Sequence, residues 1–254
     1  MTILYIIIFS FIGGFIDAVV GGGGLIQMPA LLVNLPNVPL PTLFGTNKIA
    51  ALAGTSIAAT QYAKQIKFNV KLLFIVSFFA AIASYTGAKA VSYIEVKTLK
   101  PVVLIILILI AVYTFFKKDL GAVESKVLTP KKLYLLGSLI GVIIGFYDGF
   151  FGPGTGSFLV LGFVVVLGFN FLQASAYAKI INCITNIAAL VVFIKNGNYI
   201  LNIAIFMALA NILGSLIGTK MALKNGNQFV RTIFLFIVLI MILRYSYDVF
   251  FLAK

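Results

Sequence analysis

The sequence predicts an all-α polytopic membrane protein built from two homologous repeats, and three observations lead to this fold class. Of the 254 residues, 62% are hydrophobic and 10% are charged, whereas soluble domains are about 25% charged. Apolar stretches of about 20 residues recur, each long enough to cross a hydrocarbon core about 30 Å thick. A glycine-rich motif of the first half returns in the second half, so that Asp17 corresponds to Asp148 at an offset of 131 residues.

The duplicated motif combines an aspartate, a glycine run and a later lysine. The same offset relates Gly21 to Gly152, Gly23 to Gly154 and Lys48 to Lys179, and farther along Lys64 to Lys195, Ser84 to Ser215, Gly87 to Gly218 and Lys89 to Lys220. We therefore expect a first transmembrane repeat at residues 1–118, a polar cytoplasmic linker at 119–131 and a second repeat at 132–254. Interrupted segments at matching places in two halves point to the binding site of a transporter.

Each repeat is expected to begin with a segment that glycines interrupt. The predicted membrane segments lie at residues 2–20, 42–63, 70–90 and 99–116, and then at 133–151, 172–194, 200–223 and 229–252. Short apolar stretches follow the glycines at residues 25–35 and 157–169. An eleven-residue helix covers roughly 16 Å, about half of a membrane. After the first stretch, Pro36, Pro39 and Pro41 favour an extended connection.

The short stretches leave two topologies open, with 8 to 10 membrane segments in all. If the stretches do not cross, each repeat has four spans and the repeats are parallel; if they cross with their neighbours, each has five and the repeats are inverted. The inverted arrangement, with both termini outside, places eleven basic residues in the cytoplasm and five outside, against ten and six for the parallel one. Because basic residues favour cytoplasmic loops, inverted repeats are favoured.

Charged residues inside the apolar segments are the main candidates for function. Lys48 and Lys179 lie in apolar, small-residue sequence, where a charge costs about 2.5–3.5 kcal/mol or more, so each is expected to face a cavity or a partner. The alternative is that both lysines extend to the membrane surface. Asp17 and Asp148 are candidate coupling groups, because the chain has no histidine. Each aspartate alternatively pairs with a lysine of either half or caps the broken backbone.

The glycine runs are expected to form the rest of the site. Glycines allow unusual dihedral angles and close backbone approach, and a helix that begins after a break directs free N–H groups toward an anion. The predicted site therefore includes Gly22, Gly23, Gly24 and Gly154. It also includes the neighbouring polar residues Thr46, Asn47, Thr155 and Asn182, although such residues more often join helices to one another.

Other classes of function are disfavoured by what the sequence lacks. No histidine and a single cysteine, Cys183, leave no set of metal ligands, and no cofactor motif or catalytic set is present, so we expect neither a metal site nor an enzyme. The net charge of +13 comes mainly from short connections between apolar segments. This placement is typical of positive-inside loops next to a lipid bilayer, and no nucleic-acid partner is expected.

At these motifs the chain resembles the sulfite exporter TauE/SafE family of membrane permeases. The first copy matches through Gly14-Phe15-Ile16-Asp17, Gly21–Gly24, Pro29 and Gly45-Thr46-Asn47-Lys48, and the second through Gly145-Phe146-Tyr147-Asp148, Gly152-Pro153-Gly154-Thr155-Gly156 and Ala178-Lys179. The resemblance implies transport of small anions, notably sulfite, sulfonates and related organosulfur acids. The second copy departs by carrying Tyr177-Ala178 where the first has Thr46-Asn47; Asn182 and Asn186 are candidates to supply the missing polarity.

The expected function is therefore a multi-pass permease for small anions in a bacterial or archaeal plasma membrane. Lys48, Lys179 and backbone N–H groups would bind the anion between the two interrupted segments, and Asp17 or Asp148 would couple its movement to protons or sodium. The alternatives are an anion channel and a membrane assembly partner without transport activity. A homo-oligomer is left open.

Overall fold

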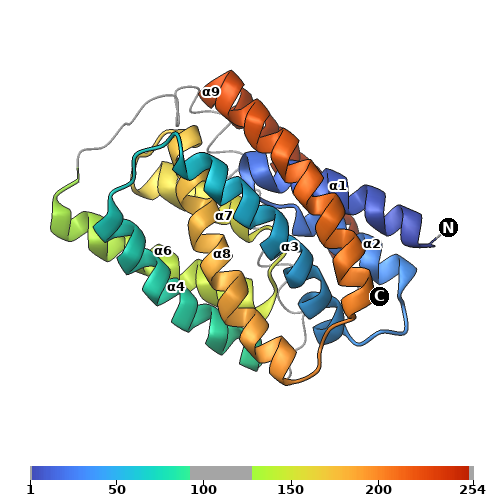
Figure 1. Cartoon of the computed structure of the whole chain (residues 1–254). Coiled ribbons are helices and arrows are strands. Elements are labelled where there is room, and N and C mark those ends of the chain that lie inside the picture. Colours follow the sequence, from blue (N-terminus) through green and yellow to red (C-terminus); the bar gives the residue numbers. More distant parts are fainter. Residues whose placement is uncertain (1, 92–127, 252–254) are drawn as a thin grey trace.

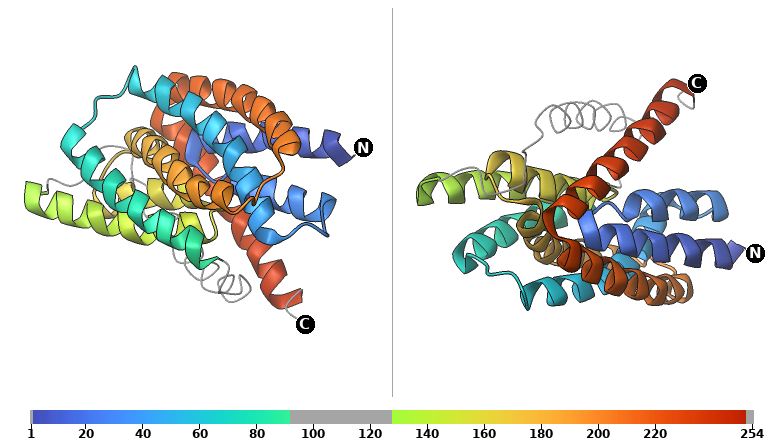
Figure 2. Two further views of the ribbon diagram at one scale, coloured as in Figure 1. Left: turned by 60° about the horizontal axis from the view of Figure 1, so that its bottom comes forward. Right: turned by 90° about the horizontal axis from the view of Figure 1, so that it is seen from above.

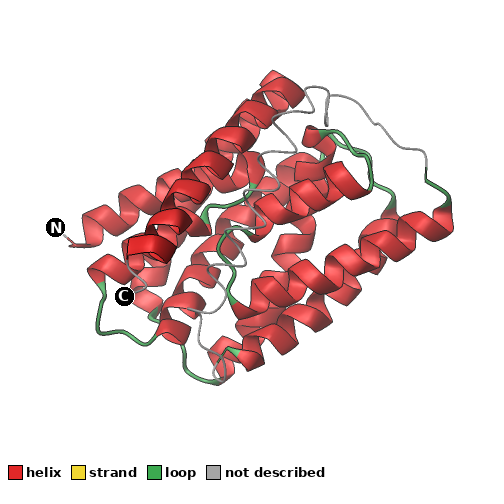
Figure 3. Cartoon of the chain, turned by 180° about the vertical axis from the view of Figure 1, so that it is seen from behind, coloured by secondary structure: helices red, strands yellow, loops and turns green. Residues whose placement is uncertain are grey.

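The computed structural model describes residues 2–91 and 128–251, which form helices joined by short loops without any strand (Figures 1 and 3). The predicted segment at residues 99–116 and most of the predicted linker lie outside the described residues. The described elements follow in the order α1 (Thr2–Val20), α2 (Gly24–Asn34), α3 (Leu40–Ala63), α4 (Val70–Ala90), α6 (Pro130–Phe150), α7 (Thr155–Leu161), the π-helical turn η2 (Gly162–Val166), α8 (Phe171–Lys195) and α9 (Leu201–Phe251).

The all-α membrane fold is confirmed. Among the described residues, five helices are long and apolar enough to cross a membrane: α1, α4, α6, α8 and the Leu201–Ile237 part of α9. Large apolar side chains such as Phe74, Leu135 and Phe236 are more than half exposed on these helices, as expected for surfaces that face lipid. Two shorter apolar helices, Gly24–Asn34 and Thr155–Val166, follow the glycine breaks where the sequence predicts short segments.

The helix α9 is bent where the sequence predicts a gap between two segments. As one straight helix its 51 residues would extend about 76 Å, more than twice the thickness of a hydrocarbon core. Gly226, with φ 69° and ψ −158°, leaves the helical region and bends the chain. The part after the bend runs away from the first part (Figure 2).

Helices of the first half pack on helices of the second. The helix α4 packs on α6, α9 packs on α1, and the central helices α3 and α8 pack on each other. A Cβ atom on Gly87 of α4 would lie 2.2 Å from the carbonyl oxygen of Phe146, and one on Gly218 of α9 would lie 2.4 Å from that of Phe15. The two glycines are 131 residues apart in sequence, as are the two phenylalanines, so both close contacts follow one pattern, which small residues make possible.

Corresponding helices of the two halves run in opposite directions. In Figure 1, α1 begins at the right near the N-terminus and runs to the left, whereas α6 begins at the far left and runs to the right. Figure 2 shows the same relation from two other sides. The central helices behave alike, since α3 runs toward the upper left of Figure 1 and α8 runs toward the lower right.

The two glycine breaks meet at the centre of the molecule. Gly21 and Gly152, at corresponding positions, have φ values of 79° and 87°, which L side chains rarely adopt. A Cβ atom on Gly21 would lie 2.1 Å from the carbonyl carbon of Gly156 in the opposite break. The hydroxyl of Ser157 donates a hydrogen bond of 3.0 Å to the carbonyl oxygen of Gly21. The breaks therefore hold the halves together and position the residues around them.

Candidate functional site

Two buried ion pairs cross between the halves beside the glycine breaks. The Nζ atom of Lys48 lies 2.9 Å from Oδ2 of Asp148, and Nζ of Lys179 lies 3.5 Å from Oδ2 of Asp17. Each lysine thus pairs with the aspartate of the other half. All four residues are buried, so neither lysine extends to the membrane surface.

A third polar side chain completes each pair, again at corresponding positions. Nζ of Lys48 donates to Oδ1 of Asn186 at 3.0 Å, and the hydroxyl of Thr55 donates to Oδ2 of Asp17 at 3.0 Å. Thr55 follows Lys48 by seven residues on α3, as Asn186 follows Lys179 on α8. Because seven residues make about two helical turns, each helix presents its lysine and its second polar residue on one face.

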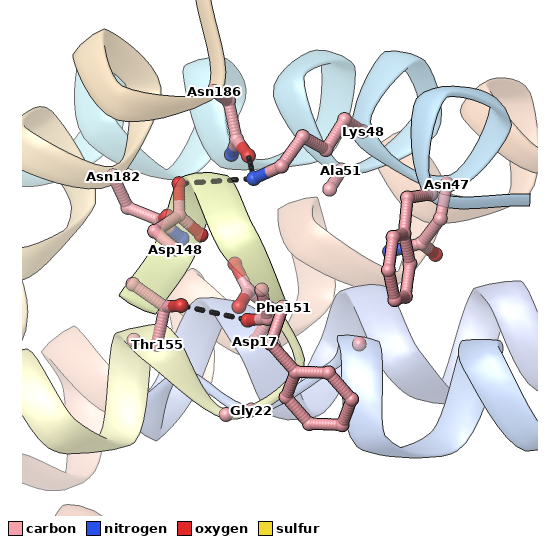
Figure 4. Close-up of a pocket in the computed structure, with 15 residues that line it drawn as sticks. Asp17, Gly22, Asn47, Lys48, Ala51, Asp148, Phe151, Thr155, Asn182 and Asn186 are labelled. Atoms are coloured by element: carbon pink, nitrogen blue, oxygen red, sulfur yellow. Dashed lines mark hydrogen bonds and ion pairs between the residues drawn. The ribbon is translucent and has the colours of Figure 1, made fainter. Parts of the chain in front are cut away.

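A small cavity lies between these groups. It encloses about 30 Å³, which is enough for a water molecule or a small ion. Figure 4 shows Lys48, Asp148 and Asn186 at one side of the cavity and Asp17, Thr155 and Gly22 at the other. The rings of Phe44 and Phe151, in an edge-to-face contact with centroids 6.0 Å apart, line it as well. The cavity therefore combines a lysine amine, two carboxylates, side-chain amides and glycine backbone with an apolar wall.

Most residues of the predicted site line this cavity: Asp17, Gly22, Gly24, Asn47, Lys48, Asp148, Gly154, Thr155 and Asn182. Lys179 lies behind Asp17, fully buried. Two predicted residues lie elsewhere. Thr46 donates through its hydroxyl to the carbonyl oxygen of Thr42 and accepts from the N–H of Ile200, so it joins α3 to the chain before α9. Gly23 precedes α2 and packs against the backbone of Gly13.

Six lining residues were not among those expected to bind the anion or couple its movement, although Asn186 was named as a candidate to supply polarity in the second copy: Phe44, Ala51, Phe151, Gly152, Gly156 and Asn186. Asn186 was identifiable as an intramembrane polar residue seven positions after Lys179. Gly152 and Gly156 belong to the recognised glycine run. The remaining three are apolar residues in apolar sequence, and no local signal separates them from residues that pack in the core.

Two buried amide atoms in the cavity have no hydrogen-bond partner within the described part of the chain. They are Oδ1 of Asn47 and Nδ2 of Asn186, and both residues line the cavity. An unsatisfied buried polar group costs about 1–3 kcal/mol, so a polar ligand would be stabilised here. The Nδ2 group of Asn186 is a donor beside the amine of Lys48, an arrangement suited to an oxygen atom with negative charge.

Comparison with known proteins agrees with the resemblance that the motifs indicate. The family model described as "Sulfite exporter TauE/SafE" matches residues 6–245. A "Probable membrane transporter protein" of Haemophilus influenzae is 33% identical over 240 residues, covering 94% of this chain and 92% of the relative. "Probable membrane transporter protein ORF9" of Sinorhizobium sp is 34% identical over 245 residues, covering 96% and 92%, and "Probable membrane transporter protein YfcA" of Escherichia coli K12 is 33% identical over 249 residues, covering 94% and 87%. No solved structure matches the chain.

Proposed function

Because the chain belongs to the sulfite exporter TauE/SafE family, we propose that this membrane transporter moves small anions and binds them in the cavity beside Lys48. The substrates proposed are sulfite, sulfonates or related organosulfur acids. A bacterial or archaeal plasma membrane is the proposed location.

The observation that carries this proposal is the pairing of Lys48 inside the cavity. Its amine is held by the carboxylate of Asp148 at 2.9 Å and by the amide oxygen of Asn186 at 3.0 Å. A sulfite or sulfonate group presents oxygen atoms and negative charge, as the carboxylate does, and it accepts the same charge-assisted hydrogen bonds. Asp148 therefore serves as an internal counter-ion that the substrate replaces, and Nδ2 of Asn186 becomes a further donor to the substrate.

Replacement of Asp148 by the substrate explains how transport is coupled. Once the anion has taken the amine of Lys48, Asp148 is a buried carboxylate without its partner, and breaking a buried pair costs about 3–5 kcal/mol. A proton on Asp148 removes this charge, so the anion and the proton favour each other's binding. The transporter would then carry the anion together with a proton, and sodium would be the alternative coupling ion.

The second pair receives a structural role in this proposal. Lys179 has no exposed surface, and Asp17 is held by both Lys179 and Thr55. The amine of Lys179 does not line the cavity. The pair thus joins α1 of the first half to α8 of the second, with the carboxylate of Asp17 at the cavity wall and the amine of Lys179 behind it, out of reach of the substrate.

Inverted repeats and alternating access complete the proposal. The opposite directions of α1 and α6 and of α3 and α8 support inverted repeats (Figure 1). In transporters of this kind one repeat rocks against the other around a fixed central site. Lysines gather at one end of the helices, where α3 ends, α4 and α6 begin and α9 bends; these are the lysines at positions 64, 67, 71, 131, 132, 220 and 224. The lysines at positions 89 and 195 lie at the other end, where α4 and α8 end. This distribution supports the first end as cytoplasmic.

The test is counterflow of a labelled anion in liposomes that contain the purified protein. A panel of sulfite, isethionate, sulfate and chloride should show saturable exchange for a sulfur oxyanion. A hydrogen bond to a charged group contributes about 1.5–3 kcal/mol, so Lys48→Gln should lower the exchange at least about tenfold. Lys195→Gln, which changes an exposed lysine at the end of α8, should leave it unchanged.

The results also separate the alternatives. Flux that does not saturate would identify a channel. Absence of flux for every anion of the panel would favour an assembly partner without transport activity. Equal exchange by wild type and Lys48→Gln at equal protein content would contradict the proposed site.

A further inference from the structure

A second, wider cavity lies on the surface between the end of α3 and the part of α9 before its bend. This α3–α9 groove encloses about 850 Å³ and is lined by Lys64, Lys220 and Lys224 together with polar and apolar neighbours. We propose that the groove binds the headgroup of an anionic phospholipid. The inference rests on the fold in the membrane and is independent of the transported substrate.

The charged residues that line the groove within the described part of the chain are all basic. All three lysines are exposed, and within the described residues none of them forms an ion pair. No described acidic residue lines the groove. Lys220 and Lys224 are one helical turn apart on α9 and therefore neighbours on its surface, while Lys64 reaches the groove from α3. Three amines from two helices thus surround a space that can hold a phosphate group.

The apolar part of the groove indicates a lipid and not a soluble phosphate. Leu216, Ile217 and Met221 line it, and they are 39%, 47% and 36% exposed. They precede or alternate with the lysines on α9, so the surface changes from apolar to basic along the helix. The bend at Gly226 follows Lys224 by two residues, so the lysines lie at the end of the first, apolar part of α9. A lipid offers acyl chains to the apolar side and a phosphate to the lysines.

The corresponding surface at the other end of the molecule is less suited to such a ligand. Lys195 and Lys89 correspond to Lys64 and Lys220, but position 93, which corresponds to Lys224, is a tyrosine. The amine of Lys89 also lies over the ring of Tyr85, 4.6 Å from its centroid. The stronger basic groove lies at the end proposed as cytoplasmic, where anionic lipids attract basic residues.

The test is native mass spectrometry of the full-length protein in a neutral detergent, titrated with short-chain phosphatidylglycerol or phosphatidylcholine. A basic residue near an anionic membrane contributes about a fivefold gain in affinity. The triple variant Lys64→Gln, Lys220→Gln, Lys224→Gln should therefore bind phosphatidylglycerol about 100-fold more weakly than wild type. Lys224→Gln alone should lose about fivefold.

The matched control is the double variant Lys89→Gln, Lys195→Gln, which removes the lysines at the corresponding positions of the other end. It should bind phosphatidylglycerol as wild type does. Unchanged binding by the triple variant, or equal loss in the double variant, would overturn the proposal. So would equal wild-type affinity for phosphatidylcholine. Competition by millimolar inorganic phosphate as effective as that by the lipid would identify a phosphate site in place of a lipid site.

Discussion

Replacement of Asp148 by asparagine should separate coupling from binding. In the wild-type cavity the carboxylate of Asp148 lies 2.9 Å from the amine of Lys48, for which, in the proposed mechanism, it competes with the substrate. Asparagine keeps the size of the side chain but can neither carry the negative charge nor take up a proton. We expect the Asp148→Asn variant to bind and exchange anions while losing the drive that a pH gradient supplies.

The size of the effect follows from the buried pair. Removing one partner of such a pair leaves a charge whose cost is about 3–5 kcal/mol, here on Lys48. A bound anion removes this cost, so Asp148→Asn should bind the anion tighter than wild type by about two to four orders of magnitude. In wild type the affinity should rise as pH falls, by up to about tenfold per pH unit, because a proton must bind with the anion. In the variant the affinity should not change with pH.

The assay is uptake of isethionate, whose sulfonate stays ionised across neutral pH, into liposomes with the membrane potential held at zero. With one proton per anion, a gradient of one pH unit should drive about tenfold accumulation by wild type. Asp148→Asn should only equalise the two concentrations, while its counterflow exchange persists and shows that the protein is folded. Tenfold accumulation by Asp148→Asn would refute the role of Asp148, and coupling would have to lie in another group or in the substrate's own protonation.

Three further predictions concern the second pair, the glycine break and the topology. Lys179→Gln alone should reduce the yield of folded protein, because Asp17 loses its lysine at a cost of about 3–5 kcal/mol. Adding Asp17→Asn to this variant should restore both the yield and the pH-driven uptake. Loss of that uptake in the folded double variant would move the coupling role to this pair. At Gly21 φ is 79° and an added Cβ atom would lie 2.1 Å from the opposite break, so Gly21→Ala should cost about 2–5 kcal/mol of stability. At Gly197 φ is 69° but no atom lies within 4 Å, so Gly197→Ala should cost about 1–2 kcal/mol. Equal shifts of the thermal unfolding midpoint in the two variants would contradict the close contact at Gly21. The topology can be tested by introducing single cysteines into a Cys183→Ala chain. A cysteine in the α3–α4 loop should react with impermeant reagents only from the cytoplasmic side, and one in the α8–α9 loop only from outside. Labelling of both cysteines from one side would exclude the inverted arrangement.

The helices were predictable because the membrane imposes a simple rule on the sequence. A segment must be apolar and long enough to cross, so the bounds expected for α1 and α4 agree with the structure. The glycine breaks were equally visible, since Gly21 and Gly152 recur at the offset of 131 residues. The number of crossings and the division into two repeats stay predictions, since residues 92–127 lie outside the described part.

The residues around the central cavity were predictable in composition but not in pairing. The intramembrane charges identified Lys48 and Asp148 without showing that they belong together, because partners 100 residues apart leave no local pattern. Thr46, in contrast, was expected in the site but lies outside the cavity. Its neighbour Lys48 enters the cavity, but two helical positions turn the side chain by about 200°, and Thr46 bonds to the chain before α9 instead.

The most direct test of the account is whether an anion that binds at Lys48 puts a proton on Asp148. Infrared difference spectra of the purified protein, recorded with and without a saturating anion of the panel, report a protonated carboxyl group by its own carbonyl band. We predict that this band appears on addition of the anion in wild type and is absent in Asp148→Asn, which still binds the anion. If wild type binds the anion without the band, or if the band persists in Asp148→Asn, then the anion does not replace Asp148 in the way proposed here.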